Sequence, residues 1–170
     1  PIPTDLATRL HGAADAARWQ LSVARFAEVL EASAAKAAGD RATVSPRELE
    51  WALSALHLRD LALACACIDG SEAAWEHFVL EHRPVLYRAA DAIDPGNGRE
   101  LADSLYADLF GLAGPGGERR SLFRYFHGRS SLATWLRAVL AQRRVDRVRT
   151  TRGHDDLPDD DSPGALTAPT

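Results

Sequence analysis

The sequence predicts an all-α fold, and two observations support this prediction. Its 170 residues include 31 Ala and 22 Leu, against only 8 Val and 3 Ile. Strands favour β-branched side chains, whereas Ala and Leu are strong helix formers, so this ratio favours helices. Apolar residues also recur every three or four positions, as they do along the buried side of a helix. A chain of this length buries enough surface to fold without disulfide bonds or metals.

The first two predicted helices cover residues 5–16 and 17–38. The first is only weakly patterned, with two leucines four positions apart. The second has a full set of apolar residues at helical spacing, namely Trp19, Val23, Phe26 and Leu30. Gly39 ends it, because glycine is the commonest residue just beyond a helix.

A third helix is predicted to begin after Ser45 and to extend to about residue 67. Ser45 suits the N-cap, Pro46 suits the first turn, and Glu48 completes a capping box. We expect residues 1–70 to form a small helical extension that packs around large aromatic side chains, which are Trp19, Phe26 and Trp51.

From residue 71 onward the pattern predicts a second group of helices. Ser71 begins a long helix that Pro84 kinks or divides, and a turn follows at residues 94–98. The next helix covers residues 101–112, where leucines repeat every three or four positions. The remaining segments are a loop at 114–117, a short helix or turn at 121–126, a polar loop at 127–131 that Ser130 or Ser131 can cap, a last helix at 132–149, and an acidic disordered segment at 153–170.

The net charge of −4 conceals a strong asymmetry along the chain. Residues 1–116 carry a net charge of −7, residues 117–152 carry ten Arg and a net charge of +8, and residues 153–170 carry −5. A basic block inside an acidic protein indicates a local site for a polyanion. The basic residues are 19 Arg and only one Lys, Lys36. We attribute this preference for Arg over Lys first to genome composition, although the planar guanidinium group also suits phosphates and base edges.

Several classes of protein and of site are not expected. No run of about 18 apolar residues indicates a membrane-spanning helix, and the amino terminus does not resemble a signal peptide. The chain also lacks an initiator Met, which suggests processing or trimming. Cys65 and Cys67 are two positions apart, so we expect two free thiols in apolar surroundings, a reducing compartment and a cytoplasmic location. We expect no metal and no cofactor.

The predicted last helix has one apolar side and one arginine-rich side. The apolar side consists of Trp135, Leu136, Val139, Leu140 and Val148. The arginines largely off this side are Arg137, Arg144, Arg147 and Arg149, with Arg143 nearer the edge. Asp146 is placed to orient one guanidinium group along the helix. A helix of this kind suits a nucleic-acid backbone, although a solvated amphipathic helix has the same pattern.

Aromatic residues lie just before this helix. Phe123, Tyr125 and Phe126 alternate with basic residues next to the polar loop. Such side chains can stack on unpaired bases, but most aromatic residues at this spacing belong to a core. We expect two of the three to be buried.

Three motifs, in order, resemble region 2 of the sigma-70 family of bacterial RNA polymerase sigma factors, of the extracytoplasmic-function type. The last helix has the form Trp135-Leu136-x-x-Val139-Leu140-Ala141-Gln142-x-x-Val145-Asp146-x-x-Arg149, which is similar to the family's Trp-Leu-x-x-Ile-Ala-x-Asn-x-x-x-Asp-x-x-Arg. The other two motifs are Trp75-x-x-Phe78-x-x-x-x-Arg83-Pro84-x-Leu86-Tyr87-x-x-Ala90 and Ala102-Asp103-Ser104-Leu105-Tyr106-Ala107-Asp108-Leu109-Phe110. The resemblance covers residues 72–152.

The resemblance implies a helical bundle of sigma region 2 type at residues 71–152, and it implies two binding surfaces. In the family, one helix docks on core RNA polymerase, and the loop and last helix recognise and open the −10 promoter element. Residues on the polymerase-binding surface would be Asp103, Ser104, Ala107, Asp108 and Phe110. Residues that bind the non-template strand of promoter DNA would be Arg124, His127, Arg129, Ser130, Ser131, Gln142, Arg143, Arg144, Arg147 and Arg149.

The chain also departs from the family pattern. Ser104 and Ala107 stand where the family has Asp and Gln, and Gln142 stands where it has Asn. A complete factor carries a second domain for the −35 element, which nothing after Arg152 can form, so we expect a fragment whose tail begins an interdomain linker. The resemblance implies no enzymatic activity.

Alternative functions remain open. The chain could be a sigma-like helical interaction module without promoter activity, which Ser104 and Ala107 favour slightly. Residues 1–70 could cover the DNA-binding surface, dock a regulatory protein such as an anti-sigma factor, or only pack on the rest of the chain. An enzyme is disfavoured, because no phosphate loop or nucleophile motif is present. His77 and His82 are five positions apart, which suits a solvated helix surface better than a metal site.

Overall fold

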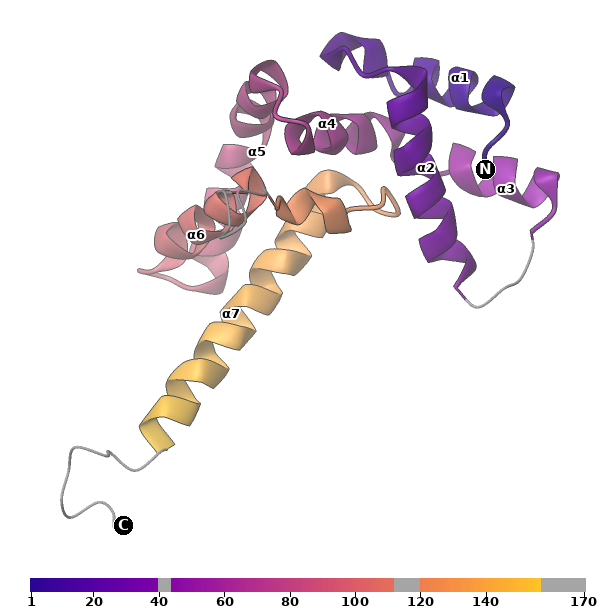
Figure 1. Ribbon diagram of the computed structural model, residues 1–170. Helices are drawn as coiled ribbons and strands as arrows, with labels where there is room; N and C mark the ends of the chain where they lie inside the picture. Colours follow the sequence, from indigo (N-terminus) through magenta and orange to yellow (C-terminus); the bar gives the residue numbers. More distant parts are fainter. Residues whose placement is uncertain (40–43, 112–119, 157–170) are drawn as a thin grey trace.

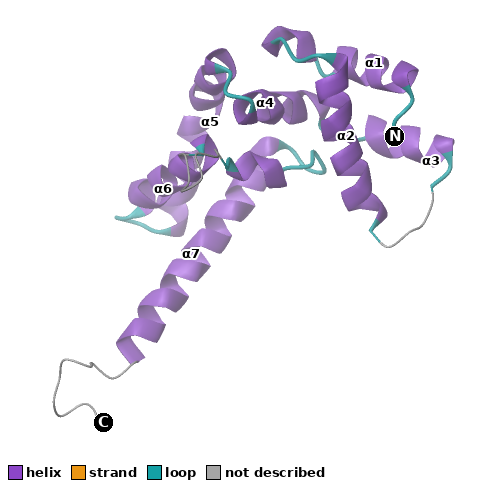
Figure 2. Ribbon diagram, viewed as in Figure 1, coloured by secondary structure: helices purple, strands orange, loops and turns teal. Residues whose placement is uncertain are grey.

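The chain is helical throughout the part that the structure describes, which confirms the predicted all-α fold (Figure 2). The computed structural model describes residues 1–39, 44–111 and 120–156, with side chains as far as residue 152. No strand is present in these ranges. The α-helices there are α1 (Thr4–Ala13), α2 (Val23–Ala38), α3 (Pro46–Ser54), α4 (Leu58–Ile68), α5 (Glu72–Ile93), α6 (Gly98–Phe110) and α7 (Leu132–Asp156), with the short 3-10 helices η1 (Ala16–Trp19) and η2 (Leu122–Tyr125).

Two predicted helices are each divided in the structure. The segment 17–38 breaks at Gln20, which has a left-handed φ of +61°, and restarts where the Ser22 hydroxyl accepts the N–H of Arg25 at 3.0 Å. The segment 46–67 breaks after Ser54, so that the N–H of His57 donates to the Gly128 carbonyl at 2.7 Å instead of continuing the helix. The prediction of continuous helices was wrong at both places. At Gln20 a left-handed turn and the Ser22 cap separate two helices, and at His57 a tertiary contact overrides local propensity.

Three predicted helix starts are confirmed, whereas the helix predicted at 101–112 begins three residues earlier, at Gly98. Ser45, Ser71 and Ser131 each accept a backbone N–H three residues further on, at 3.1, 3.1 and 3.2 Å. Pro84 lies inside α5 and does not divide it. The last helix runs to Asp156, seven residues beyond the predicted end at 149, and so includes backbone that was predicted to be disordered. The predicted loop at 114–117 and most of the predicted linker lie outside the described residues.

Helix α4 is the centre of the core. Eight of its eleven residues are buried, including both cysteines, which are free thiols as predicted. Around it lie Phe26 from α2, Phe78 from α5 and Phe123 from η2, all with no exposed surface. A single buried cluster therefore joins helices on both sides of residue 70, and the proposed boundary between two domains there stays a prediction.

The chain forms a body from which one helix projects (Figure 1). Helices α1 to α4 lie together on one side, and α5 and α6 pack as a pair on the other. Helix α7 begins between these two parts and extends away from them. In the described ranges no single helix is long and apolar enough to cross a membrane, and α3 and α4 reach that length only together, across an 80° bend.

Candidate nucleic-acid interface

The loop at residues 127–131 has a defined shape. Gly128 adopts a φ of +77°, which an L-residue rarely does, and its carbonyl accepts from His57. The Ser130 hydroxyl donates to the Ser131 carbonyl at 3.1 Å, and Ser131 caps α7. Of the two predicted capping candidates, Ser131 is therefore the one that caps the helix.

Helices from outside the resemblance hold this loop. The buried Ser33 hydroxyl of α2 donates to the His127 carbonyl at 3.1 Å. The first N–H of α7, on Leu132, donates to the Asp60 carboxylate of α4 at 2.8 Å. A carboxylate is favourable there because the amino-terminal end of a helix carries partial positive charge. Sequence reasoning missed Ser33 and Asp60, since neither belongs to a local motif.

Next to the loop, η2 exposes one aromatic ring and buries two. Phe123 and Phe126 are buried and Tyr125 is 57% exposed, which confirms the prediction that two of the three belong to the core. The Arg124 guanidinium lies 4.9 Å from the centre of the Tyr125 ring, and its Nη2 donates to the Tyr125 hydroxyl at 3.1 Å. This pair forms a flat, charged, solvent-facing surface.

The His127 imidazole is half-buried, and Arg129 is exposed at the tip of the loop. Burial lowers the pKa of His127, and the positive charge of Lys36 lowers it further. His127 is therefore predominantly neutral at pH 7 and can act as a hydrogen-bond donor or acceptor there.

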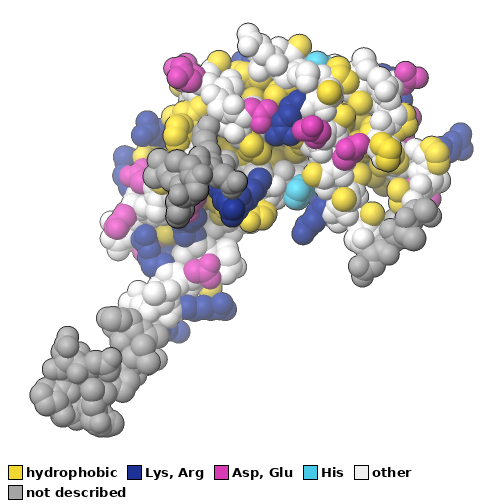
Figure 3. All heavy atoms as spheres, in the orientation of Figure 1, with side chains coloured by type: hydrophobic (Ala, Val, Ile, Leu, Met, Phe, Trp, Pro, Cys, Tyr) yellow, Lys and Arg dark blue, Asp and Glu magenta, His cyan; other side chains and the backbone are white. Residues whose placement is uncertain are grey.

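Helix α7 has the two sides that its sequence predicts. Leu132, Leu136 and Leu140 are buried against the body, and Trp135 packs against Phe126 with ring centres 5.4 Å apart. Figure 3 shows Lys and Arg side chains along the projecting part of the helix and at its junction with the body. Within the described residues, no carboxylate pairs with a group of six arginines, which we call the arginine row: Arg124, Arg129, Arg137, Arg147, Arg149 and Arg152.

Arg143 and Arg144, by contrast, face the body. Arg143 Nη2 lies 2.5 Å from the Asp108 carboxylate, and its Nη1 donates to the Ser104 hydroxyl at 3.2 Å. Arg144 is half-buried, with Nε 3.5 Å from the carboxylate of Asp94 in the α5–α6 turn. The expectation that Arg144 lies off the packed side was wrong, because a tertiary carboxylate faces it.

The sequence predicted that Asp146 orients a guanidinium group. Among the described residues, Asp146 has no such partner. Its carboxylate accepts instead from the side-chain amide of Gln142 at 3.0 Å, one turn earlier in α7. The amide at this position, like the carboxylate, therefore remains on the exposed surface of the helix.

Helix α6 presents the five residues of the predicted polymerase-binding surface on two adjacent sides. Asp103, Ala107 and Phe110 are exposed, and the Asp103 carboxylate accepts from the Tyr87 hydroxyl at 2.7 Å. Phe110 packs edge-on against Trp75 of α5 at 5.2 Å. Ser104 and Asp108 instead face α7 through Arg143. The structure thus brings residues from both predicted surfaces into direct contact.

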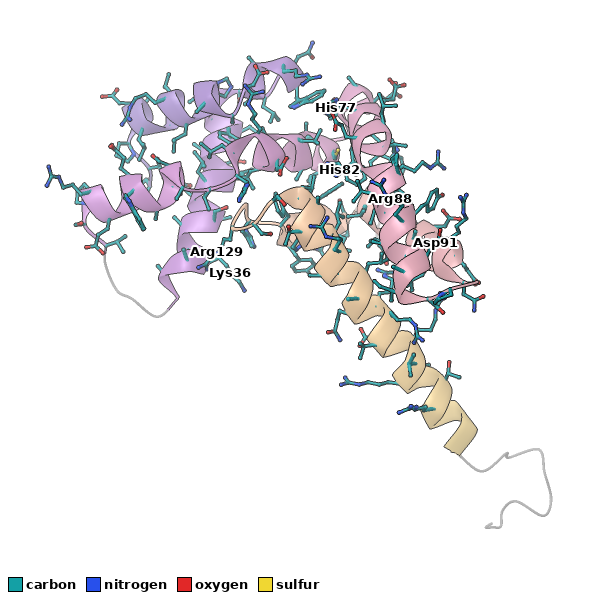
Figure 4. All side chains as sticks on the ribbon, turned by 180° about the vertical axis from the view of Figure 1, so that it is seen from behind. Lys36, His77, His82, Arg88, Asp91 and Arg129 are labelled. Atoms are coloured by element: carbon teal, nitrogen blue, oxygen red, sulfur yellow. The ribbon has the colours of Figure 1, made fainter. Side chains whose placement is uncertain are left out.

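The sequence suggested a solvated helix surface for the two histidines of α5, whereas both are only partly exposed. His77 packs against Trp19 with ring centres 5.3 Å apart, and His82 stacks on Phe78 at 5.2 Å. Nδ1 of His82 is buried and has no hydrogen-bond partner among the residues that the structure describes, and burial lowers the pKa of this histidine. Figure 4 shows both on α5, where His82 lines a hollow together with Asp60 of α4, the residue that accepts the first N–H of α7.

The aromatic residue Trp51 is also placed differently from the prediction. Its side chain is 77% exposed and lines a hollow of about 790 Å³ between α2 and α3, instead of contributing to a core. This hollow contains none of the predicted site residues.

Comparisons with protein families, with curated proteins and with solved structures found no match to this chain. The assignment of function therefore depends on the residues and their geometry.

Proposed function

We propose that this chain is part of a sigma-type transcription initiation factor. In this proposal it binds core RNA polymerase through the exposed side of α6, and it binds the non-template strand of the −10 promoter element through the loop 127–131 and α7. The observation that carries the proposal is the arginine row, in which six cations without a described carboxylate partner follow η2, the loop and α7.

The physical basis is the binding of a polyanion. Arginines that are already neutralised by carboxylates would lose that pairing on binding phosphate, whereas the arginine row gives up only solvent and, for Arg124 and Arg137, a neutral hydroxyl partner. Each phosphate contact releases condensed counterions, which favours association at low salt. Helix α7 is fixed to the body by its leucines, so these cations are presented on a rigid element.

Unpaired bases need a stacking surface as well as charge. The exposed Tyr125 ring with its Arg124 neighbour supports such a role, because every base can stack on an aromatic or guanidinium plane. Stacking of about 1–3 kcal/mol per base would offset the few kcal/mol required to unstack a base from a duplex.

The test is fluorescence anisotropy with a labelled pool of single-stranded, −10-like oligonucleotides. It is run with and without core RNA polymerase, at two salt concentrations. We expect weak, salt-sensitive binding by the chain alone and tighter, sequence-selective binding with polymerase. Substituting Arg147 and Arg149 with Ala removes two cations without disturbing Asp108, and we expect the salt slope to fall by about 1.4.

Arg88→Ala is the matched control, because this arginine is exposed on α5, away from the loop (Figure 4). It should leave both the affinity and the salt slope unchanged. If neither the chain nor its mixture with polymerase binds the oligonucleotides, the proposal is wrong, and an interaction module without promoter activity becomes the better description.

A further inference from the structure

Helix α2 is attached to the loop 127–131, although it lies outside the stretch that carries the arginine row. Ser33, which is 1% exposed, donates to the His127 carbonyl and fixes this side of α2 against the loop. Two further contacts fix the loop at Gly128 and at the start of α7. The His57 N–H donates to the Gly128 carbonyl, and the Leu132 N–H donates to the Asp60 carboxylate. The loop and the carboxyl-terminal half of α2 therefore form one fixed unit.

Lys36 lies on the same side of α2, one turn after Ser33. Residues three apart in a helix share a side. Because Ser33 is buried against the loop, Lys36 lies at the edge of the contact between α2 and the loop. In the view of Figure 4, Lys36 on α2 and Arg129 on the loop project to the same side of the molecule. Lys36 is exposed and has no carboxylate partner in the described ranges, and its charge acts on the His127 ring.

We propose that Lys36 is part of the nucleic-acid site and contacts a backbone phosphate of the strand that the loop binds. This inference rests on the proposed function, and it adds to the site a helix that the family resemblance does not cover. Two cations on separate elements, Lys36 and Arg129, would then flank the strand at the loop. A lysine acts there as a compact point charge that tolerates any base sequence.

The experiment measures binding of the full chain to a fluorescein-labelled oligothymidylate of about 20 nucleotides, across a series of salt concentrations. Lys36→Gln removes one charge from an exposed position and should not affect folding. We expect its Kd at low salt to rise roughly three- to tenfold, and the slope of log K against log salt to fall by about 0.7, the value for one phosphate on a single strand. Lys36→Arg should keep both values.

Arg47→Gln is the matched control. It removes the same charge from an exposed position on α3, which lies on the far side of α2 from α7 (Figure 1). It should leave the slope unchanged. If wild-type chain binds the oligonucleotide and Lys36→Gln has the wild-type slope, the role of Lys36 is refuted while the proposed function stands. If the wild-type chain does not bind the oligothymidylate at low salt, the role of Lys36 is refuted, and the assay with −10-like oligonucleotides and polymerase decides the proposed function.

Discussion

Replacing Gly98 with Ala should destabilise the protein through the contact between α5 and α6. A Cβ atom added at Gly98 would lie 2.5 Å from the carbonyl carbon and oxygen of Ala90 and 2.7 Å from the nitrogen of Asp91. These are backbone atoms, so relief requires the two helices to separate by about 1 Å, since ordinary carbon contacts begin near 3.5 Å. Overpacking of this kind costs about 1–3 kcal/mol, and more where backbone must move.

Thermal unfolding followed by circular dichroism measures this effect. Each kcal/mol shifts Tm by about 2–4 °C in a protein of this size, so a cost of about 2 kcal/mol lowers Tm by about 4–8 °C. The control is Gly12→Ala in α1, where nothing lies within 4 Å of the added Cβ. Because Ala is the better helix former, this variant should gain up to about 1 kcal/mol. A Gly98→Ala protein that melts within about 1 °C of wild type would refute the close approach of the helices.

Three further predictions follow from buried polar groups. Ser121→Ala removes a buried hydroxyl that donates to the Leu109 carbonyl and accepts the Phe123 N–H. Urea unfolding should show that the free energy of unfolding falls by about 1–3 kcal/mol. A fall below about 0.5 kcal/mol would contradict this role. Burial raises the pKa of the Cys65 thiol to about 12. A thiol reagent at about pH 8 should therefore label the native chain far more slowly than the unfolded chain. Equal labelling rates would show that the thiol is accessible. Burial lowers the pKa of His82, so the unfolded chain binds a proton more readily than the folded chain, and stability is lost as the pH falls below about 6.5. Between about pH 7 and 5, the urea midpoint should therefore drop less in His82→Gln than in the wild type. An equal drop in the two proteins would contradict the assignment.

The elements of this fold that the sequence predicted well are those set by local signals. Serine caps and apolar spacing located the starts of α3, α5 and α7, because a capping hydroxyl acts within three residues of its own position. The burial of two aromatic residues near Phe123 also follows from local spacing. The elements that failed were decided by distant partners, as in the break before α4, where His57 donates to Gly128.

The predicted site residues show the same distinction. Arg149 is exposed on α7 and Arg147 is partly exposed, in keeping with helical spacing. Spacing placed Arg143 nearer the edge but did not separate Arg144 from them, since whether an arginine faces a carboxylate depends on helices far away in the sequence. Asp108 on α6 and Asp94 in the preceding turn provide those carboxylates. Arg143 consequently connects the two surfaces of the proposed function, which makes it a poor position at which to test either one alone.

The dependence of the loop on residues before 71 has a consequence for the proposed site. Asp60 caps α7 from 72 positions away, and Ser33 contacts His127 from 94 positions away, so no local pattern could reveal either. A fragment that began at residue 71 would leave the Leu132 N–H and the carbonyls of His127 and Gly128 without these partners. It would also expose the underside of α5 and η2, which α4 covers. The loop that the resemblance assigns to base recognition therefore owes its shape to helices outside that resemblance, and the binding that we propose for it would depend on the whole chain.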